Sequence, residues 1–134
     1  MNSSGGQTVS INHESQSIGF WGEQRACEFL EQKGMILIER NFRVREGEID
    51  LVMEDAGILV FVEVKTRSSL LFGAPEDSIH KRKLDRLFKA AHAYLEGLEN
   101  SEQDWRIDIV AIECTLDRKL KRLDHYPNIA LMEE

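Results

Sequence analysis

Cysteine is scarce in this sequence and long apolar segments are absent, and each shortage excludes a class of protein. The two cysteines, Cys27 and Cys114, fit neither a CxxC motif nor the spacing of a zinc site. Each lies in an apolar periodic segment, which predicts a buried, reduced thiol. The longest apolar run, residues 58–62, is far shorter than the roughly 20 residues that span a bilayer, and the N-terminus lacks a signal-peptide pattern. We therefore expect a cytoplasmic protein with no membrane partner.

Basic residues are also in the minority. The 17 Lys and Arg residues face 24 Asp and Glu residues, which gives a net charge of −7. This balance disfavours nucleic acid as a partner, because Lys and Arg supply most of the non-specific affinity for phosphate. The basic residues are nevertheless clustered. One group lies in residues 118–122, and the other consists of Lys81, Arg82, Lys83, Arg86 and Lys89. Such clusters either bind nucleic acid or form solvated faces.

The length and composition fit one globular domain. A chain of 134 residues that is 42% hydrophobic and 31% charged can bury a core, but it is too short for two comfortable domains. Residues 1–17 are rich in Ser, Asn, Gln and Gly and have little to bury, so they predict a flexible N-terminal tail. We expect the folded domain at residues 18–125 and a C-terminal tail at residues 126–134.

The spacing of apolar residues predicts an α/β fold. Helical spacing over residues 18–33 is followed by Gly34 as a C-terminal cap, and a second helix with an apolar stripe is expected at residues 78–97. Strands are expected at residues 35–44, 48–54 and 58–66, joined by turns at Gly47 and Gly57. Because these turns have no room for a helix, the three strands predict an antiparallel meander. Residues 105–114 predict a strand covered on both faces, and residues 120–125 an edge strand.

The hairpin between the second and third strands brings acidic residues together. A tight turn at Ala56 and Gly57 pairs residues whose numbers sum to 113, so that Asp50 faces Glu63. Directly opposite residues share a face, with Cβ atoms about 4.5 to 5.5 Å apart. Lys65, two residues beyond Glu63, points to the same face. A slip of one residue would turn every side chain to the opposite face, so the site depends on this register.

The surroundings of Glu63 favour a metal ion. Five apolar residues precede it, so part of its face belongs to the core. Two carboxylates beside a core repel each other strongly unless a cation lies between them. Two carboxylates, a backbone carbonyl and water form the incomplete oxygen set that Mg²⁺ accepts, leaving positions for a substrate phosphate and an attacking water. Lys65 could then position or deprotonate that water.

A third acid, Glu23, comes from the first helix. It shares the helix face of Ala26, Cys27 and Leu30, which places its carboxylate on the side that meets the sheet. Two structural readings compete with catalysis: Asp50, Glu63 and Lys65 as cross-strand ion pairs on a half-exposed sheet, and Glu23 as a partly exposed helix acid. The four histidines show no mutual metal spacing and are interpreted as surface or helix-face residues: His13, His80, His92 and His125.

Four short motifs resemble a known family. They are Gly22-Glu23, Asn41-Phe42-Arg43, Gly47-Glu48-Ile49-Asp50-Leu51 and Phe61-Val62-Glu63-Val64-Lys65-Thr66-Arg67. Together they resemble the YraN-like family of small bacterial proteins, over about residues 18–125. That family is similar to the PD-(D/E)xK nuclease superfamily and, in layout, to archaeal Holliday junction resolvases. The resemblance implies a restriction-endonuclease-like αβββαβ core, with a mixed central sheet flanked by helices.

The resemblance also implies roles for individual residues. Asp50 and Glu63 would bind the metal with the Val64 carbonyl, Lys65 would be the catalytic lysine, and Glu23 would be the acid on the helix. Arg43 and Arg67 would face nucleic acid. One departure is that Ile49 occupies the position of the proline in the superfamily's Pro-Asp pair.

These observations lead to one functional hypothesis and two alternatives. The hypothesis is an endonuclease that hydrolyses nucleic acid phosphodiesters with Mg²⁺, or Mn²⁺ as a substitute, with DNA favoured over RNA and branched or flap structures as candidate substrates. The first alternative is a non-catalytic nucleic-acid-binding or assembly module that keeps the acidic cluster for structure. The second is an RNA-processing nuclease. A homodimer or a protein partner is compatible with each of them.

Overall fold

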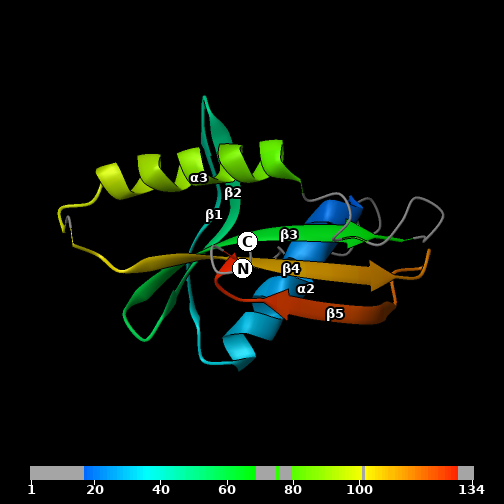
Figure 1. Ribbon diagram of the computed structural model, residues 1–134. Helices are drawn as coiled ribbons and strands as arrows, with labels where there is room; N and C mark the ends of the chain where they lie inside the picture. The colour runs from blue at the N-terminus through cyan, green and yellow to red at the C-terminus, as the bar shows by residue number, and fades with distance from the viewer. Residues whose placement is uncertain (1–16, 69–74, 76–79, 101, 130–134) are drawn as a thin grey trace, which may run out of the picture.

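The computed structural model describes residues 17–68, 75, 80–100 and 102–129 (Figure 1). Three sequence-based expectations therefore fall wholly or partly outside the described residues. They are the N-terminal tail up to residue 16, the first two residues of the second helix at 78–79, and the end of the C-terminal tail at residues 130–134.

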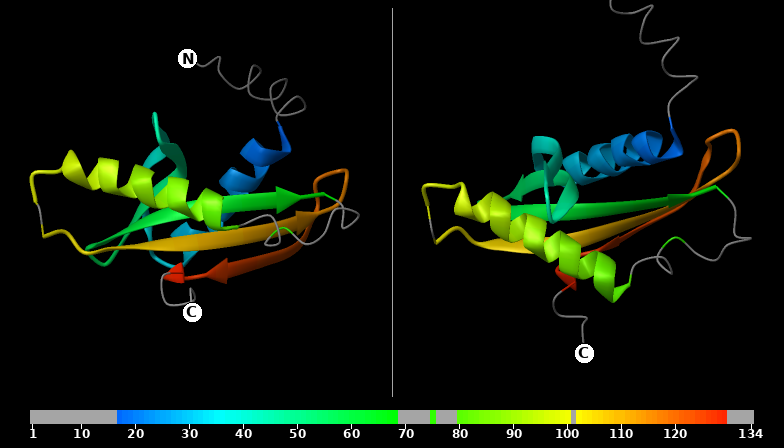
Figure 2. Two further views of the ribbon diagram at one scale, coloured as in Figure 1. Left: turned by 45° about the horizontal axis from the view of Figure 1, so that its top comes forward. Right: turned by 90° about the horizontal axis from the view of Figure 1, so that it is seen from above.

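The described chain forms a five-stranded sheet flanked by two helices. The strands lie side by side in chain order: β1 (Ile36–Val44), β2 (Gly47–Asp55), β3 (Ile58–Arg67), β4 (Trp105–Cys114) and β5 (Leu120–Tyr126). Helix α2 (Ile18–Gln32) lies on one face and helix α3 (Lys81–Glu96) on the other (Figure 2). The β3–β4 pair is parallel, with α3 in the crossover, and the other pairs are antiparallel. This is the predicted mixed sheet with an αβββαβ core, extended by β5.

Helix α2 begins and ends as the sequence predicts. The Ser17 side chain accepts a hydrogen bond of 3.1 Å from the backbone N–H of Phe20, which satisfies one free donor of the first turn. At the other end Gly34 has φ of +100°, a left-handed conformation that glycine adopts without steric cost. The face between these caps is buried against the sheet and includes Trp21, Ala26 and Leu30.

Helix α3 buries its predicted apolar stripe and exposes its charges. Leu87, Ala90 and Ala91 are buried against the sheet, and Leu84 and Leu95 pack at the edges of the same cluster. The helix begins at Lys81, after an extended N-cap at residue 80, and ends at residue 96. Its outer face is left to the basic residues of the first turns.

The sheet separates two cores. The cluster on the α2 side contains Leu51, Val60 and Val62, and the cluster on the α3 side contains Val52 and Phe61. Neighbouring residues of a strand point to opposite faces, which explains why residues 51–53 of β2 and 58–62 of β3 are continuously apolar. Both cysteines are buried and free in the α2-side core, which confirms their sequence-based interpretation.

The chain remains packed beyond residue 125. The side chain of Ile129 is buried in the α3-side core, and the backbone N–H of Asn128 donates to the Asp108 carboxylate at 2.9 Å. The same carboxylate accepts hydrogen bonds from His125 and Arg106, so a wholly buried acid is fully paired. No helix in the described part of the chain is long and apolar enough to cross a membrane.

Candidate active site

The candidate site lies where β2 and β3 separate. Their ladder runs from Asp55↔Ile58 to Leu51↔Val62, which confirms the predicted register because each pair sums to 113. The ladder does not continue to a pair between Asp50 and Glu63. Instead, an Asp50 Oδ2 atom accepts a hydrogen bond of 2.8 Å from the backbone N–H of Val64. The Asp50 side chain thus takes the place of the next ladder bond.

An irregularity in β2 produces this arrangement. Ile49 packs in the α3-side core and Leu51 in the α2-side core, although residues two apart in a regular strand share a face. The strand therefore twists at Asp50. Strand β1 is also irregular opposite Asp50. Residues 40 and 42 of β1 pair with residues 51 and 49 of β2, and Asn41 between them has φ of 54°. The twist turns the Asp50 carboxylate toward the opening between β2 and β3.

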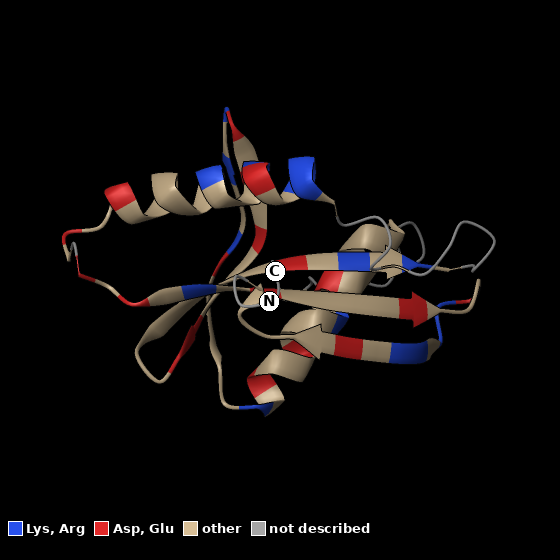
Figure 3. Ribbon diagram, viewed as in Figure 1, with Lys and Arg blue, Asp and Glu red and all other residues tan. Residues whose placement is uncertain are grey.

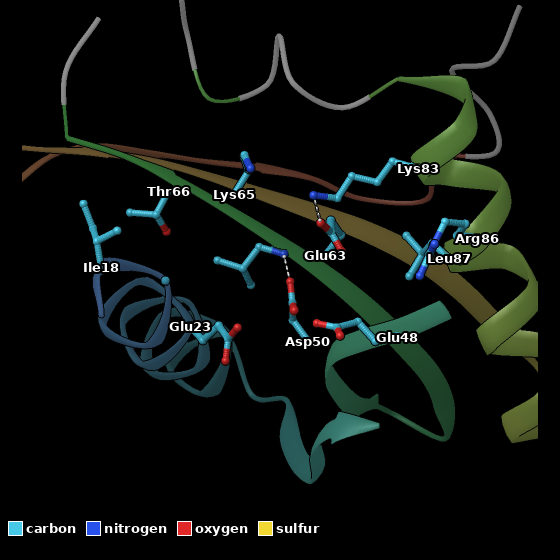
Figure 4. Close-up of a pocket in the computed structure, with 12 residues that line it drawn as sticks. Ile18, Glu23, Glu48, Asp50, Glu63, Lys65, Thr66, Lys83, Arg86 and Leu87 are labelled. Atoms are coloured by element: carbon cyan, nitrogen blue, oxygen red, sulfur yellow. Dashed lines mark hydrogen bonds and ion pairs between the residues drawn. The ribbon is translucent and has the colours of Figure 1, made fainter. Parts of the chain in front are cut away.

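Acidic side chains from three elements and basic side chains from two line a cavity of about 430 Å³ at this opening (Figure 4). The acids are Glu23 of α2, Glu48 and Asp50 of β2, and Glu63 of β3. The bases are Lys65 of β3 and Lys83 and Arg86 of α3. In Figure 4 Glu23 points into the cavity from α2, Asp50 lies in the middle, and Lys83 reaches from α3 to Glu63.

Burial and mutual repulsion disfavour the charged forms of the acids. Burial, followed by the charge of Glu63, raises the pKa of Asp50 to about 8, although the Val64 N–H opposes the shift. Burial also raises the pKa of Glu23, against the effect of nearby Arg40. The pKa of Glu63 is raised by burial as well, although Lys83 opposes that shift. Without a cation, the cavity therefore disfavours full ionisation of its acids.

Two lysines lie on the α3 side of the cavity. Lys83 Nζ is 2.9 Å from an oxygen of Glu63, whose side chain is only 7% exposed. Lys65 shares the sheet face of Glu63, as predicted. Burial, followed by the charges of Lys83 and Arg67, lowers the pKa of Lys65. A lysine with a lowered pKa can exchange a proton more readily near neutral pH.

Two Gly-Glu pairs position acids at the cavity. A Cβ atom added to Gly22 would overlap the Thr66 side chain, lying 2.9 Å from its Cβ, so glycine lets α2 approach β3 closely. A Cβ atom added to Gly47 would overlap the backbone carbonyl of Arg86, so glycine also lets β2 approach α3. In each pair the following residue, Glu23 or Glu48, lines the cavity.

The structure gathers part of the predicted site set. Glu23, Asp50, Glu63, Val64 and Lys65 all line the cavity, together with two predicted nucleic-acid contacts on α3, Lys83 and Arg86. The remaining predicted contacts do not line it. Arg67, the last residue of β3, has a buried Nε without a hydrogen-bond partner among the described residues.

Four predicted nucleic-acid contacts are exposed and do not line the cavity. Lys81 pairs with Asp85 within the same helix, with 3.8 Å between Nζ and the carboxylate. Arg43 pairs across the β1–β2 hairpin with Glu48 at 3.3 Å. Arg82 and Lys89 complete this exposed set.

The sequence-based reasoning missed two charged groups. Glu48 was not assigned a role, yet it lines the cavity and its charge raises the pKa of Asp50 and Glu63. Its position two residues before Asp50 was an available signal, because such residues share a face in a regular strand. Arg40, which opposes the pKa shift of Glu23, comes from the neighbouring strand. No short motif joins it to Glu23.

The donor atoms fit a hard divalent cation that keeps part of its water. No three His, Cys, Asp or Glu side chains in the described ranges are grouped so that they could hold a metal ion alone. A site at Asp50 and Glu63 would therefore need further oxygen ligands. The N–H and C=O groups of one strand residue point to the same side, so the Val64 carbonyl faces the opening as its N–H does. Mg²⁺ is commonly bound by one or two carboxylates with water and phosphate oxygens.

Comparison with known proteins identifies the family. Residues 22–112 match the model of the uncharacterised protein family UPF0102. The chain belongs to this family. UPF0102 proteins of Syntrophomonas wolfei and Chlorobium limicola are 44% and 45% identical to it, covering 73% and 76% of this chain and 85% and 79% of theirs. A UPF0102 protein of Herpetosiphon aurantiacus is 38% identical, over 88% of this chain and 97% of its own.

The family match includes every charged residue of the cavity. It begins at Gly22, next to Glu23, and continues past Arg86, the last of the basic residues that line the site. The resemblance to the YraN-like family seen in the sequence motifs is thereby confirmed.

Proposed function

We propose that this protein hydrolyses phosphodiester bonds of nucleic acid, with Mg²⁺ or Mn²⁺ bound at Asp50 and Glu63. The observation that carries the proposal is the environment of Asp50. This carboxylate is 7% exposed, is fixed by the Val64 N–H, and has its pKa raised to about 8 by burial and by neighbouring acids. Burial and repulsion disfavour the ionised forms of these acids, and a bound cation would offset both effects.

The acidic and basic groups of the cavity suit the charges of the reaction. When bound, the cation would act as a Lewis acid toward the phosphodiester and lower the pKa of water. The basic groups Lys65, Lys83 and Arg86 would receive the phosphate oxygens and stabilise the charge that develops on them. Lys65, with its lowered pKa, is the group best suited to hold or accept a proton at the attacking water. Glu23 would orient water from the α2 side.

A cleavage assay tests this function. Linear, flapped and four-way DNA and structured RNA are incubated with Mg²⁺ or Mn²⁺ and wild type, Asp50→Asn or Lys65→Ala protein. We expect wild type to cleave DNA, Asp50→Asn to lose metal binding and cleavage together, and Lys65→Ala to bind metal but cleave about 10² to 10⁴ times more slowly. Cleavage that survives in Asp50→Asn would assign the activity to another site or to a contaminant.

A second candidate is a nucleic-acid-binding or assembly module without catalysis. One observation favours it: Glu63 is already paired with Lys83 and Asp50 already accepts from Val64, so both acids have partners without a metal. The module requires no metal affinity at these residues. Calorimetric titration with Mg²⁺ separates the two candidates. The nuclease requires that wild type bind Mg²⁺ and that Asp50→Asn fail to bind it, whereas the module requires no binding in either protein.

A further inference from the structure

The ion pair between Lys83 and Glu63 crosses the cavity. Glu63 lies on β3, whereas Lys83 comes from the first turn of α3, and 2.9 Å separates Nζ from the carboxylate oxygen. The Glu63 side chain is 7% exposed and that of Lys83 is 35% exposed. The ammonium group therefore covers a buried carboxylate from the solvent-accessible side.

This pair competes with the cation of the proposed function. A divalent cation and an ammonium group repel each other, and both need the lone pairs of the same carboxylate. Lys83 has a flexible stem and lines the cavity of about 430 Å³, so its ammonium group has space to move away from Glu63. Arg86, one turn along α3, also lines the cavity but has no ion pair with Glu63 among the described interactions. Lys83 therefore differs from Arg86 in having an ion pair with Glu63 that a cation can break.

We propose that Lys83 is a displaceable counter-ion, which holds Glu63 in the metal-free protein and moves to a nucleic acid phosphate when a divalent cation binds. This inference rests on the proposed function, because it requires metal binding at Glu63. It makes metal and nucleic acid binding cooperative: the cation releases Lys83, and the released ammonium group gains a phosphate. By linkage, nucleic acid that holds Lys83 strengthens metal binding by the same factor.

The first test measures metal affinity without nucleic acid. Mn²⁺ is titrated calorimetrically into wild type, Lys83→Met and Arg86→Met protein. Lys83→Met removes the competitor, so its Mn²⁺ dissociation constant should fall about three- to tenfold, the range expected when one ordinary intramolecular hydrogen bond no longer has to be broken. Arg86→Met removes the same charge from the same cavity but leaves the pair intact, so it should show a clearly smaller change.

The second test measures the coupling. Binding of a flapped DNA is titrated with EDTA and with Ca²⁺, used here as a divalent cation for binding measurements. With EDTA, Lys83→Met should lose less DNA affinity relative to wild type than it does with Ca²⁺, because Glu63 holds the lysine in the metal-free protein. With Ca²⁺, wild type should gain more affinity than Lys83→Met. Circular dichroism checks folding, and Lys83→Gln replaces Lys83→Met if the latter does not fold.

The outcomes separate this inference from the proposed function. Equal or weaker Mn²⁺ affinity in Lys83→Met, with metal binding and cleavage intact in wild type, would overturn the displacement of Lys83 and leave the nuclease standing. An equal loss of DNA affinity with and without Ca²⁺ would also overturn it, because Lys83 would then be an ordinary phosphate contact. Wild type that binds no metal would overturn both.

Discussion

At the scale of residues, the site depends on how Asp50 is held. A carboxylate in a regular strand would point to one face of the sheet, but the twist at Asp50 turns it into the opening where the Val64 N–H donates to it. The hydrogen bond stabilises the charged form, whereas burial and Glu63 destabilise it more, so the pKa of Asp50 rises to about 8. The Asp50 side chain is thus fixed in position, although its charged form is disfavoured.

The disfavoured charge of Asp50 predicts how stability depends on pH without metal. The pKa of Asp50 is about 8 in the folded protein and 3.8 ordinarily, so its contribution is most favourable below about pH 4 and declines as pH rises toward 8. Glu23 and Glu63 act in the same direction, because their pKa values are also raised. Asp50→Asn keeps an acceptor for Val64 but carries no charge. Above about pH 8 in EDTA, we expect it to be several kcal/mol more stable than wild type.

Urea unfolding in EDTA between about pH 5 and pH 9 checks this expectation. The stability of wild type should fall over this range, and that of Asp50→Asn should fall less. Asp50→Asn protein that is less stable than wild type at the alkaline end would mean that the Asp50 charge is better compensated than its burial and acidic neighbours indicate.

Some residue positions could be predicted from the sequence and others could not. The register of the β2–β3 hairpin followed from its two-residue turn and gave every ladder pair from 51 to 55. The hydrogen bond of Asp50 did not follow, because pattern reasoning assumes regular alternation and cannot locate a twist. The role of Arg40 was also hidden, since its approach to Glu23 depends on how β1 packs beside α2.

At the scale of elements, the apolar patterns were strong enough to place every helix and strand of the described chain. β4 has the predicted bounds, residues 105–114. Its continuous apolar residues predicted a strand that is buried on both faces of the sheet. What the patterns could not give was how closely α2 and α3 approach the sheet. Gly22 and Gly47 set these distances, and their role becomes visible only when a Cβ atom is placed on each.

Gly22 offers a test at this scale. In Gly22→Ala, the new methyl group would overlap Thr66, so α2 must shift away from β3 or Thr66 must change its rotamer. Such overpacking typically costs about 1 to 3 kcal/mol, and a shift of α2 would also move Glu23 away from Asp50. We expect lower thermal stability and, if the protein is a nuclease, weaker cleavage.

Gly19→Ala is the matched control for this substitution. The same helix carries Gly19, where an added Cβ atom would meet only Ser17 Oγ at 3.9 Å. Alanine favours helix over glycine by roughly 1 kcal/mol, so this variant should be as stable as wild type or more so. Thermal unfolding of both variants distinguishes crowding from helix propensity. Equal stability of Gly22→Ala and Gly19→Ala would show that the close approach of α2 is not needed.

At the scale of the whole molecule, the charge distribution resolves an apparent conflict. A net charge of −7 disfavours nucleic acid binding, but four of the acids gather in the candidate site, where a cation would offset them. Lys83 and Arg86 of α3 line the same cavity, and Figure 3 shows further Lys and Arg residues on that helix. Local complementarity therefore matters more than the total, since exposed charges act over about 8 to 10 Å at ordinary ionic strength.

The salt dependence of DNA binding tests this distribution. Removing one phosphate contact should lower the slope of log K against log salt by about one unit, so Arg86→Gln should bind DNA with a flatter slope than wild type. Lys119→Gln, which removes an exposed charge that is paired with Asp117 and does not line the cavity, should leave the slope unchanged. Identical slopes for all three proteins would assign the basic residues of α3 to a solvated face.

A crystal soaked in Mn²⁺ at about pH 8, where the pKa of Asp50 permits ionisation, tests the central proposal most directly. Anomalous diffraction locates manganese without reference to activity. We predict an anomalous peak bounded by the carboxylates of Asp50 and Glu63 and the carbonyl of Val64, and no such peak in an Asp50→Asn crystal soaked alongside. A wild-type crystal in which these carboxylates hold no manganese would contradict the proposal that this cavity is a metal-dependent active site.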